Sequence, residues 1–216
     1  MEETTPQQKV GENLVETTEF YYVPRETKSI YKSKYQTFMK KELLLAHLRN
    51  IPDFPKPGIQ FKDVSTLFKN PLCIREMLDE MVSLYKDKGI TKVVGIESRG
   101  FVMGAILAAE LGAGFVMCRK IGKLPGNTRK MSYGKEYGED TIEIHTDAFS
   151  PTDVVLIHDD LLATGGSMKA AIDLVDSFGV KDIYVNFIIE LRMEGLKGRE
   201  FLGNRADITT LLTLFE

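Results

Sequence analysis

Two adjacent carboxylates precede a turn rich in glycine and hydroxyl groups in the segment VVLIHDDLLATGGSMKAA, residues 154–171. Asp159 and Asp160 end an apolar run that is typical of a buried strand, and a helix is expected to follow the turn. The turn consists of Thr164, Gly165, Gly166 and Ser167. Consecutive backbone N–H groups and the positive end of a helix form a cradle for a phosphate group, and glycine lets the backbone approach the phosphate oxygens closely.

The two acids indicate a second ligand group beside the phosphate, because carboxylates would repel the phosphate itself. Sugar hydroxyls donate hydrogen bonds to carboxylates, each worth about 1.5–3 kcal/mol, and a pair of acids can also attract Mg²⁺. The spacing therefore predicts a ribose-5-phosphate site, with Asp159 and Asp160 on the 2′ and 3′ hydroxyls. A solvated Asp-Asp turn before an ordinary helix is the alternative. The glycine motifs of P-loop and Rossmann nucleotide sites are both incomplete in this chain.

Strands and helices alternate around this segment. Strands are predicted at 92–96, 114–118, 141–145, 153–158, 181–189 and 208–214, and helices at 71–85, 101–111 and 167–178. This alternation is typical of an α/β fold with a doubly wound, mostly parallel sheet. Ligands bind at the carboxyl ends of the strands in such sheets. The segments 97–100, 119–140 and 159–167 should therefore converge there.

The composition supports one globular domain. The chain has 216 residues, of which 43% are hydrophobic and 27% charged. Its net charge of −3 and pI near 5.8 argue against a general nucleic-acid or membrane-surface partner. No apolar run approaches the roughly 20 residues of a membrane span. Cys73 and Cys118 lie among apolar residues, which indicates reduced core thiols and a cytoplasmic protein.

The first 38 residues differ from the rest of the chain, and we expect them to form an N-terminal extension to a domain at 39–216. Residues 1–19 are polar without a pattern, and we expect them to be mobile. Residues 20–38 hold six of the twenty Phe and Tyr residues, so we expect them to pack against the domain or a partner subunit. Anion attraction by their basic side chains is the alternative. A short helix is expected to begin at Met39. The three prolines of segment 51–58 predict a rigid extended connector.

The segment from 154 to 167 closely resembles the phosphoribosyl pyrophosphate motif of type I phosphoribosyltransferases. His158 replaces an apolar residue of that motif, and we interpret it as a core histidine or as one that supports the site residues from behind, and not as a catalyst. Four further segments resemble the adenine-specific members of this family, in the same order. They are IPDFPKPGIQFKDVSTLF (51–68), ESRGF (97–101), RKIGKLPG (119–126) and SYGKEYG (132–138). The resemblance covers roughly 40–216 and implies the type I phosphoribosyltransferase fold, with 51–68 as a small hood over the base site.

The resemblance implies a reaction as well as a fold. Adenine and 5-phosphoribosyl 1-pyrophosphate would form AMP and pyrophosphate in purine salvage. Mg²⁺ would bridge pyrophosphate and sugar oxygens, with Asp159 and Asp160 as candidate ligands, and the family implies a homodimer. Two alternatives remain: a regulatory protein that binds nucleotide without turnover, and transfer to hypoxanthine or guanine. Enzymes for 6-oxopurines carry an acid where this chain has Ala163, which favours adenine.

The resemblance assigns the phosphoribosyl pyrophosphate contacts to three groups of residues. The first group consists of the two acids, Ala163 and the turn at 164–167. Glu97 and Ser98 lie in the pyrophosphate loop, where we expect a cis peptide bond between them. The cations that balance the pyrophosphate charge would be Arg119, Lys120 and Lys123.

The base and the lid have their own candidates. Adenine would lie near Gln60, Phe61 and Lys62 of the hood, with Arg99 beside it as a candidate catalytic residue. Gln60 and Lys62 depart from the apolar residue and the arginine common at these positions. The segment 119–140 is expected to be a long lid loop. In it, Glu136 would exchange a proton with the purine ring, and the lid residues Tyr133 and Tyr137 would shield the site.

Overall fold

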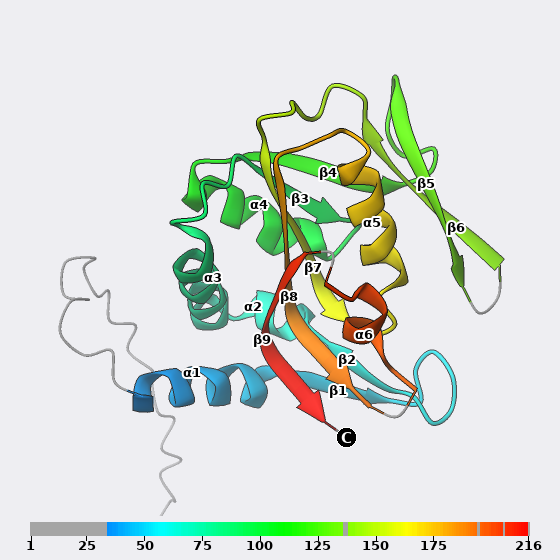
Figure 1. The fold of residues 1–216 in the computed structure, drawn as a ribbon. Coiled ribbons are helices and arrows are strands. Elements are labelled where there is room, and N and C mark those ends of the chain that lie inside the picture. The colour runs from blue at the N-terminus through cyan, green and yellow to red at the C-terminus, as the bar shows by residue number, and fades with distance from the viewer. Residues whose placement is uncertain (1–33, 136–137, 194, 205, 216) are drawn as a thin grey trace, which may run out of the picture.

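The computed structural model describes residues 34–135, 138–193, 195–204 and 206–215 of the chain. Within these ranges, a seven-stranded sheet carries helices on both faces, and a separate two-stranded hairpin lies beside it (Figure 1). No described helix is both long enough and apolar enough to cross a bilayer. The predictions for residues 1–19 and for most of 20–38 lie outside the described residues.

The large sheet has the strand order β5-β6-β4-β3-β7-β8-β9. Five neighbouring strands pair in parallel: β4 (Gly114–Lys120), β3 (Lys92–Ile96), β7 (Val154–Leu162), β8 (Asp182–Arg192) and β9 (Asp207–Phe215). The chain winds outward from β3 in both directions, so the topological switch lies between β3 and β7, where ligands bind in open α/β sheets. The predicted doubly wound, mostly parallel sheet is confirmed.

Helices cover both faces of the parallel strands. One core forms under α3 (Pro71–Tyr85) and α4 (Gly100–Leu111), and a second core forms under α5 (Gly166–Asp176). Leu156 of β7 contributes to the first core and Ile157 to the second. A strand that is buried on both faces favours apolar side chains on both, which explains the continuous apolar run at 154–157 that opens β7.

The Asn70 side chain caps the amino end of α3. Its side chain accepts hydrogen bonds from the backbone N–H groups of Leu72 at 2.9 Å and Cys73 at 3.4 Å. Pro71 occupies the first turn, where its missing N–H costs nothing. The helix buries Met77, Leu78, Met81 and Tyr85.

The hood is an antiparallel hairpin of β1 (Arg49–Pro52) and β2 (Gln60–Asp63), followed by the short helix α2 (Ser65–Lys69). The prediction of an extended connector at 51–58 is wrong, because the chain reverses there. The Asp53 carboxylate accepts a hydrogen bond from the Gly58 N–H at 2.7 Å, which closes the turn. The Phe54 ring packs edge-on against Phe61, with 5.1 Å between ring centroids.

The helix predicted to begin at Met39 begins earlier. Helix α1 spans Lys34–His47 and therefore crosses the boundary that we expected at residue 38. The five residues before Met39 include neither glycine nor proline, so nothing in the local sequence stops the helix there.

The lid segment at 119–140 is not a long irregular loop. Its second half forms β5 (Thr128–Lys135), which pairs with β6 (Gly138–His145) as an antiparallel hairpin. Few residues of β5 are apolar, so its sequence shows no clear alternation. Tertiary contacts hold it instead: the Arg129 guanidinium lies 4.2 Å from the centroid of the Phe178 ring, behind the end of α5. Among the described residues of the predicted loop, only 121–127 remain irregular.

Candidate active site

Three predicted segments meet at the carboxyl ends of β3, β4 and β7. Ile96 of β3 pairs with Cys118 of β4, and Gly95 pairs with His158 of β7. The residues directly after these paired positions are Glu97, Arg119 and Asp159. The strand register alone therefore brings the candidate pyrophosphate loop, the basic segment and the acid pair to one edge of the sheet.

The acid pair is largely withdrawn from solvent. Asp160 is only 3% exposed and Asp159 is half-buried. Burial, and then the neighbouring negative charge of Asp160, raise the pKa of Asp159 well above its usual value. Asp160 has a cationic partner, since its Oδ2 lies 2.6 Å from Nε of Arg99. The pair can accept hydrogen bonds from sugar hydroxyls, and a cation that binds here would favour the charged form of Asp159.

Arg99 connects this acid pair to the hood. Its guanidinium carbon lies 5.6 Å from the centroid of the Phe61 ring on β2, at the distance of a cation–π contact. One side chain thus touches a predicted ribose-binding residue and a predicted base-binding residue. The Gln60 side chain accepts a hydrogen bond from Asn50 at 2.6 Å on the exposed side of the hairpin.

The cis peptide bond expected between Glu97 and Ser98 is present. The Glu97 carboxylate accepts hydrogen bonds from Nε and Nη2 of Arg119, at 3.1 and 3.3 Å, and from the Lys120 N–H at 3.0 Å. Burial acts to raise the pKa of Glu97, but the bonds from Arg119 and Lys120 hold this pKa below its usual value. Glu97 therefore orients the start of the basic segment.

A buried acid that the sequence analysis did not single out fixes the rest of this segment. Glu143 of β6 is 2% exposed and accepts the backbone N–H groups of Lys123 and Leu124 at 3.0 and 3.1 Å. Its other oxygen accepts the Thr128 hydroxyl at 3.0 Å. Arg119 adds a bond from Nη1 to the Lys123 carbonyl at 3.0 Å. No local motif marks Glu143, because its partners lie 15 to 20 residues away along the chain.

The turn at 164–167 leads directly into a helix, as the sequence predicts. Gly165 has φ = +83°, a conformation that favours glycine, and α5 begins at the next residue. The first N–H groups of a helix have no partner within it, so they are available to a phosphate group. A Cβ atom built on Gly166 would lie 3.4 Å from Cδ2 of Tyr133. The β5–β6 hairpin therefore packs directly against the turn at 164–167.

The short helix α6 (Gly198–Leu202) lies against the same turn, and the sequence analysis did not assign it to the site. A Cβ atom on Gly198 would lie 2.3 Å from the Ala163 carbonyl oxygen. The one signal available in the sequence was this glycine within the basic segment LKGR, residues 196–199.

The described residues contain no group of three or more His, Cys, Asp or Glu side chains arranged to hold a metal ion. Asp159 and Asp160 alone supply two carboxylates, so a bound Mg²⁺ would need further oxygens from substrate and water. The lid candidates Glu136 and Tyr137 lie outside the described residues.

Known proteins share this sequence and this fold. The phosphoribosyl transferase domain family matches residues 63–197. The adenine phosphoribosyltransferase of Phocaeicola vulgatus is 62% identical over 176 residues, which cover 82% of this chain and 100% of that relative.

Two solved structures show the same architecture. Adenine phosphoribosyltransferase from Rhodothermus marinus has a TM-score of 0.76 and 47% identity, with 82% of this chain and 99% of that chain covered. The enzyme from Giardia lamblia, complexed with 9-deazaadenine, has a TM-score of 0.75 and 46% identity, with 80% and 97% covered. This chain therefore belongs to the adenine phosphoribosyltransferases, within the phosphoribosyl transferase domain family.

Proposed function

We propose that this chain transfers the phosphoribosyl group of 5-phosphoribosyl 1-pyrophosphate to adenine, forming AMP and pyrophosphate in purine salvage. The observation that carries the proposal is the position of Arg99, which pairs with Asp160 at 2.6 Å and lies 5.6 Å from the Phe61 ring centroid. A ribose-binding acid and a base-binding ring thus lie on either side of one cation. The Giardia lamblia relative, complexed with an adenine analogue, supports the choice of base.

The residues at the strand ends suit the charges that develop in this reaction. As the bond between C1 and the pyrophosphate breaks, positive charge grows on the ribose and negative charge on the leaving group. Asp159 and Asp160 would hold the ribose hydroxyls, and Thr164, Gly165, Gly166 and Ser167 the 5′-phosphate. Arg119, Lys120 and Lys123 would stabilise the departing pyrophosphate, and Mg²⁺ when bound would neutralise part of its charge.

The adenine ring would lie under the hood, between the Phe61 ring and the carboxyl end of β7. Lys62, which is largely buried, and the backbone at Gln60 would line this side of the site. Adenine is favoured over 6-oxopurines because Ala163 has no carboxylate to pair with their ring proton. Glu136 is proposed to exchange a proton with the bound purine. Tyr133 and Tyr137 would exclude water as the lid closes.

We further propose a cytoplasmic homodimer with no nucleic-acid or membrane partner. Val102 of α4 and Met117 and Ile121 in and after β4 are exposed apolar residues on neighbouring elements, as expected of a subunit interface. Cys73 and Cys118 are free and buried thiols, which suits a reducing compartment. Residues 1–38 are proposed to be an extension outside the catalytic domain, since a complete relative aligns with only 176 residues of this chain.

A direct assay tests the proposed reaction. The protein is mixed with 5-phosphoribosyl 1-pyrophosphate and Mg²⁺, adenine, hypoxanthine or guanine is added separately, and nucleotide formation is followed. We expect turnover with adenine alone. Turnover with hypoxanthine or guanine would contradict the role of Ala163, and tight nucleotide binding without turnover would make the chain a regulator.

A further inference from the structure

Helix α6 fixes one side of the phosphate cradle by direct backbone contact. A Cβ atom on Gly198 would lie 2.3 Å from the Ala163 carbonyl oxygen and 2.7 Å from Cδ1 of Leu162. Conversely, a Cβ atom on Gly165 would lie 3.0 Å from the Gly198 carbonyl oxygen. The two segments are therefore as close as glycine permits, and any movement of Gly198 must move the turn at 163–165.

The helix itself is too short to hold this position. It has five residues, and isolated helices shorter than about 12–15 residues are marginal in water. Its place must therefore be set by contacts with the rest of the domain. Leu202 supplies an apolar contact, since it is buried under the turn at Gly165.

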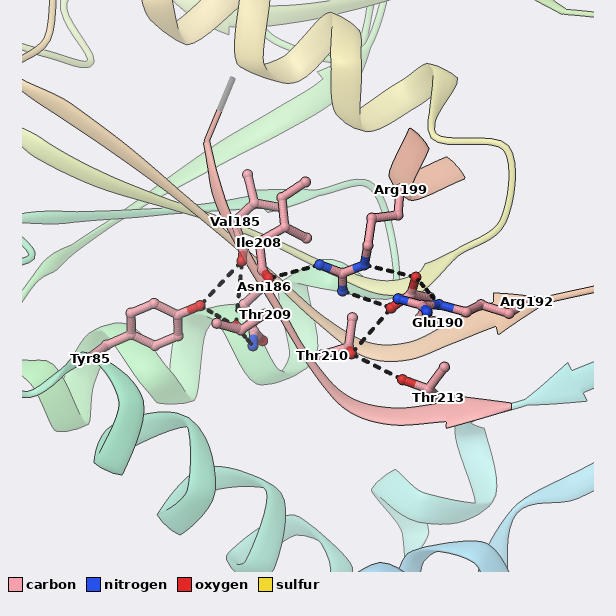
Figure 2. Close-up of polar contacts among 10 residues, drawn as sticks. All are labelled: Tyr85, Val185, Asn186, Glu190, Arg192, Arg199, Ile208, Thr209, Thr210 and Thr213. Carbon is pink, nitrogen blue, oxygen red and sulfur yellow. Dashed lines mark hydrogen bonds and ion pairs between the residues drawn. The ribbon is translucent and has the colours of Figure 1, made fainter. Parts of the chain in front are cut away.

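The polar anchor of α6 is Arg199, the residue next to Gly198 (Figure 2). Its Nε and Nη2 donate to the two carboxylate oxygens of Glu190 at 2.8 and 2.7 Å. Its Nη1 donates to the Ile208 carbonyl at 3.0 Å. One planar guanidinium thus ties α6 to both β8 and β9, and its fork geometry specifies orientation as well as distance.

Glu190 is buried and held in an orientation that binds this guanidinium. It is 2% exposed and also accepts hydrogen bonds from Nε of Arg192 at 2.9 Å and from the Thr210 hydroxyl at 3.4 Å (Figure 2). Burial acts to raise the pKa of Glu190, but the bonds from Arg199 and Arg192 hold this pKa below its usual value. A charged, oriented carboxylate therefore lies at the base of α6.

We propose that Arg199, held by Glu190, is a positioning residue that sets the phosphate cradle through the contact of Gly198 with the turn at 163–165. Arg199 reaches the substrate only through this backbone contact. The inference rests on the proposed function, since it assigns the 5′-phosphate of 5-phosphoribosyl 1-pyrophosphate to this turn.

Two matched arginine-to-lysine variants test the proposal. Arg199→Lys keeps the positive charge but loses the planar fork and the bond to Ile208. Arg192→Lys also loses a guanidinium bond to Glu190, but Arg192 lies outside α6. Calorimetry measures the Kd of 5-phosphoribosyl 1-pyrophosphate with Mg²⁺ and without adenine, and the KM for adenine is measured separately. We expect Arg199→Lys to raise this Kd at least fivefold and to change the adenine KM less than twofold. We expect Arg192→Lys to change the Kd and the adenine KM less than twofold each.

Equal Kd values for the two variants would overturn the proposal, as would a parallel rise in the adenine KM. If Arg199→Lys does not fold, Gly198→Ala replaces it, because its new Cβ must displace the turn while the Glu190–Arg199 pair remains. An unchanged Kd in Gly198→Ala would equally overturn the proposal. Wild-type protein that binds 5-phosphoribosyl 1-pyrophosphate but does not convert adenine would instead refute only the proposed reaction.

Discussion

His158 shows how a polar residue can serve the core directly beside the site. It is fully buried, and its Nδ1 lies 2.9 Å from Oδ1 of Asn186. Asn186 in turn donates from Nδ2 to the Thr209 hydroxyl at 2.9 Å, and Thr209 hydrogen-bonds to the Tyr85 hydroxyl (Figure 2). The Asn186 amide oxygen thus accepts, which makes Nδ1 of His158 the protonated nitrogen of a neutral ring. The interpretation of His158 as a core histidine is confirmed.

His158 should make the protein sensitive to acid. Burial lowers the pKa of His158 to about 4, whereas an unfolded histidine titrates near 6.5. Between these values the unfolded state binds the extra proton, so the free energy of unfolding falls as pH falls, by about 3 kcal/mol over the window. We expect His158→Gln to lose this dependence in urea unfolding at pH 4 to 7.

The difference between wild type and His158→Gln isolates the contribution of His158 to the pH dependence of unfolding, because Asp159 titrates in both proteins. His47 is exposed, so His47→Gln should retain the wild-type dependence on pH. Wild type and His158→Gln with parallel curves would show that His158 does not titrate in this range.

The acid pair should dominate the affinity for phosphoribosyl pyrophosphate. We expect Asp159→Asn combined with Asp160→Asn to weaken its binding more than tenfold, since each lost charge-assisted contact costs about 1.4 kcal/mol or more. Calorimetry with Mg²⁺ measures the Kd. Asp182→Asn, at the exposed amino end of β8, is the control. An unchanged Kd in the double variant would mean that the acids are structural.

At the scale of elements, the close approach of α4 to β7 determines how the site is assembled. A Cβ atom on Gly100 would lie 2.6 Å from the His158 carbonyl oxygen and 3.2 Å from Cα of Asp159. The first turn of α4 therefore presses backbone against backbone on the strand that carries the acids. This contact brings Arg99, which precedes the helix, within reach of Asp160.

Two glycine-to-alanine variants in α4 separate this contact from helix propensity. We expect Gly100→Ala to lower the free energy of unfolding by about 1–3 kcal/mol, the usual cost of overpacking, and to raise the Kd of phosphoribosyl pyrophosphate. In Gly104→Ala the nearest atom is 3.1 Å away, on the Phe115 ring, a side chain that can move. Urea unfolding and calorimetry compare the two, and equal losses in both variants would contradict the role of the α4–β7 contact.

At the scale of the whole molecule, the catalytic part and the N-terminal extension should be separable. Every site residue predicted from the sequence lies between Gln60 and Ser167, helix α6 lies at Gly198–Leu202, and a relative covered over its whole length aligns with 176 residues of this chain. We therefore expect the strand ends to assemble without residues 1–33.

We expect a chain that begins at residue 34 to keep kcat/KM for adenine within about twofold of the full chain, a change of about 0.4 kcal/mol. Static light scattering on both proteins measures the number of subunits. A truncated chain that is active but monomeric would assign the subunit interface to the extension. Loss of activity without a change in assembly would place part of the active site there.

The sequence by itself determined the alternation of strands and helices, the glycine turn before α5 and the adjacent acid pair, because each depends on neighbouring residues or on local periodicity. The tertiary structure decided the rest. The roles of Glu97 and Glu143 follow from partners 15 to 23 residues away along the chain. The role of Glu190 follows from the placement of α6 beside β8, and the hairpin of β5 is held by packing on α5 rather than by its own pattern. Such long-range pairings leave no period in the sequence, since either partner alone resembles a solvated surface charge.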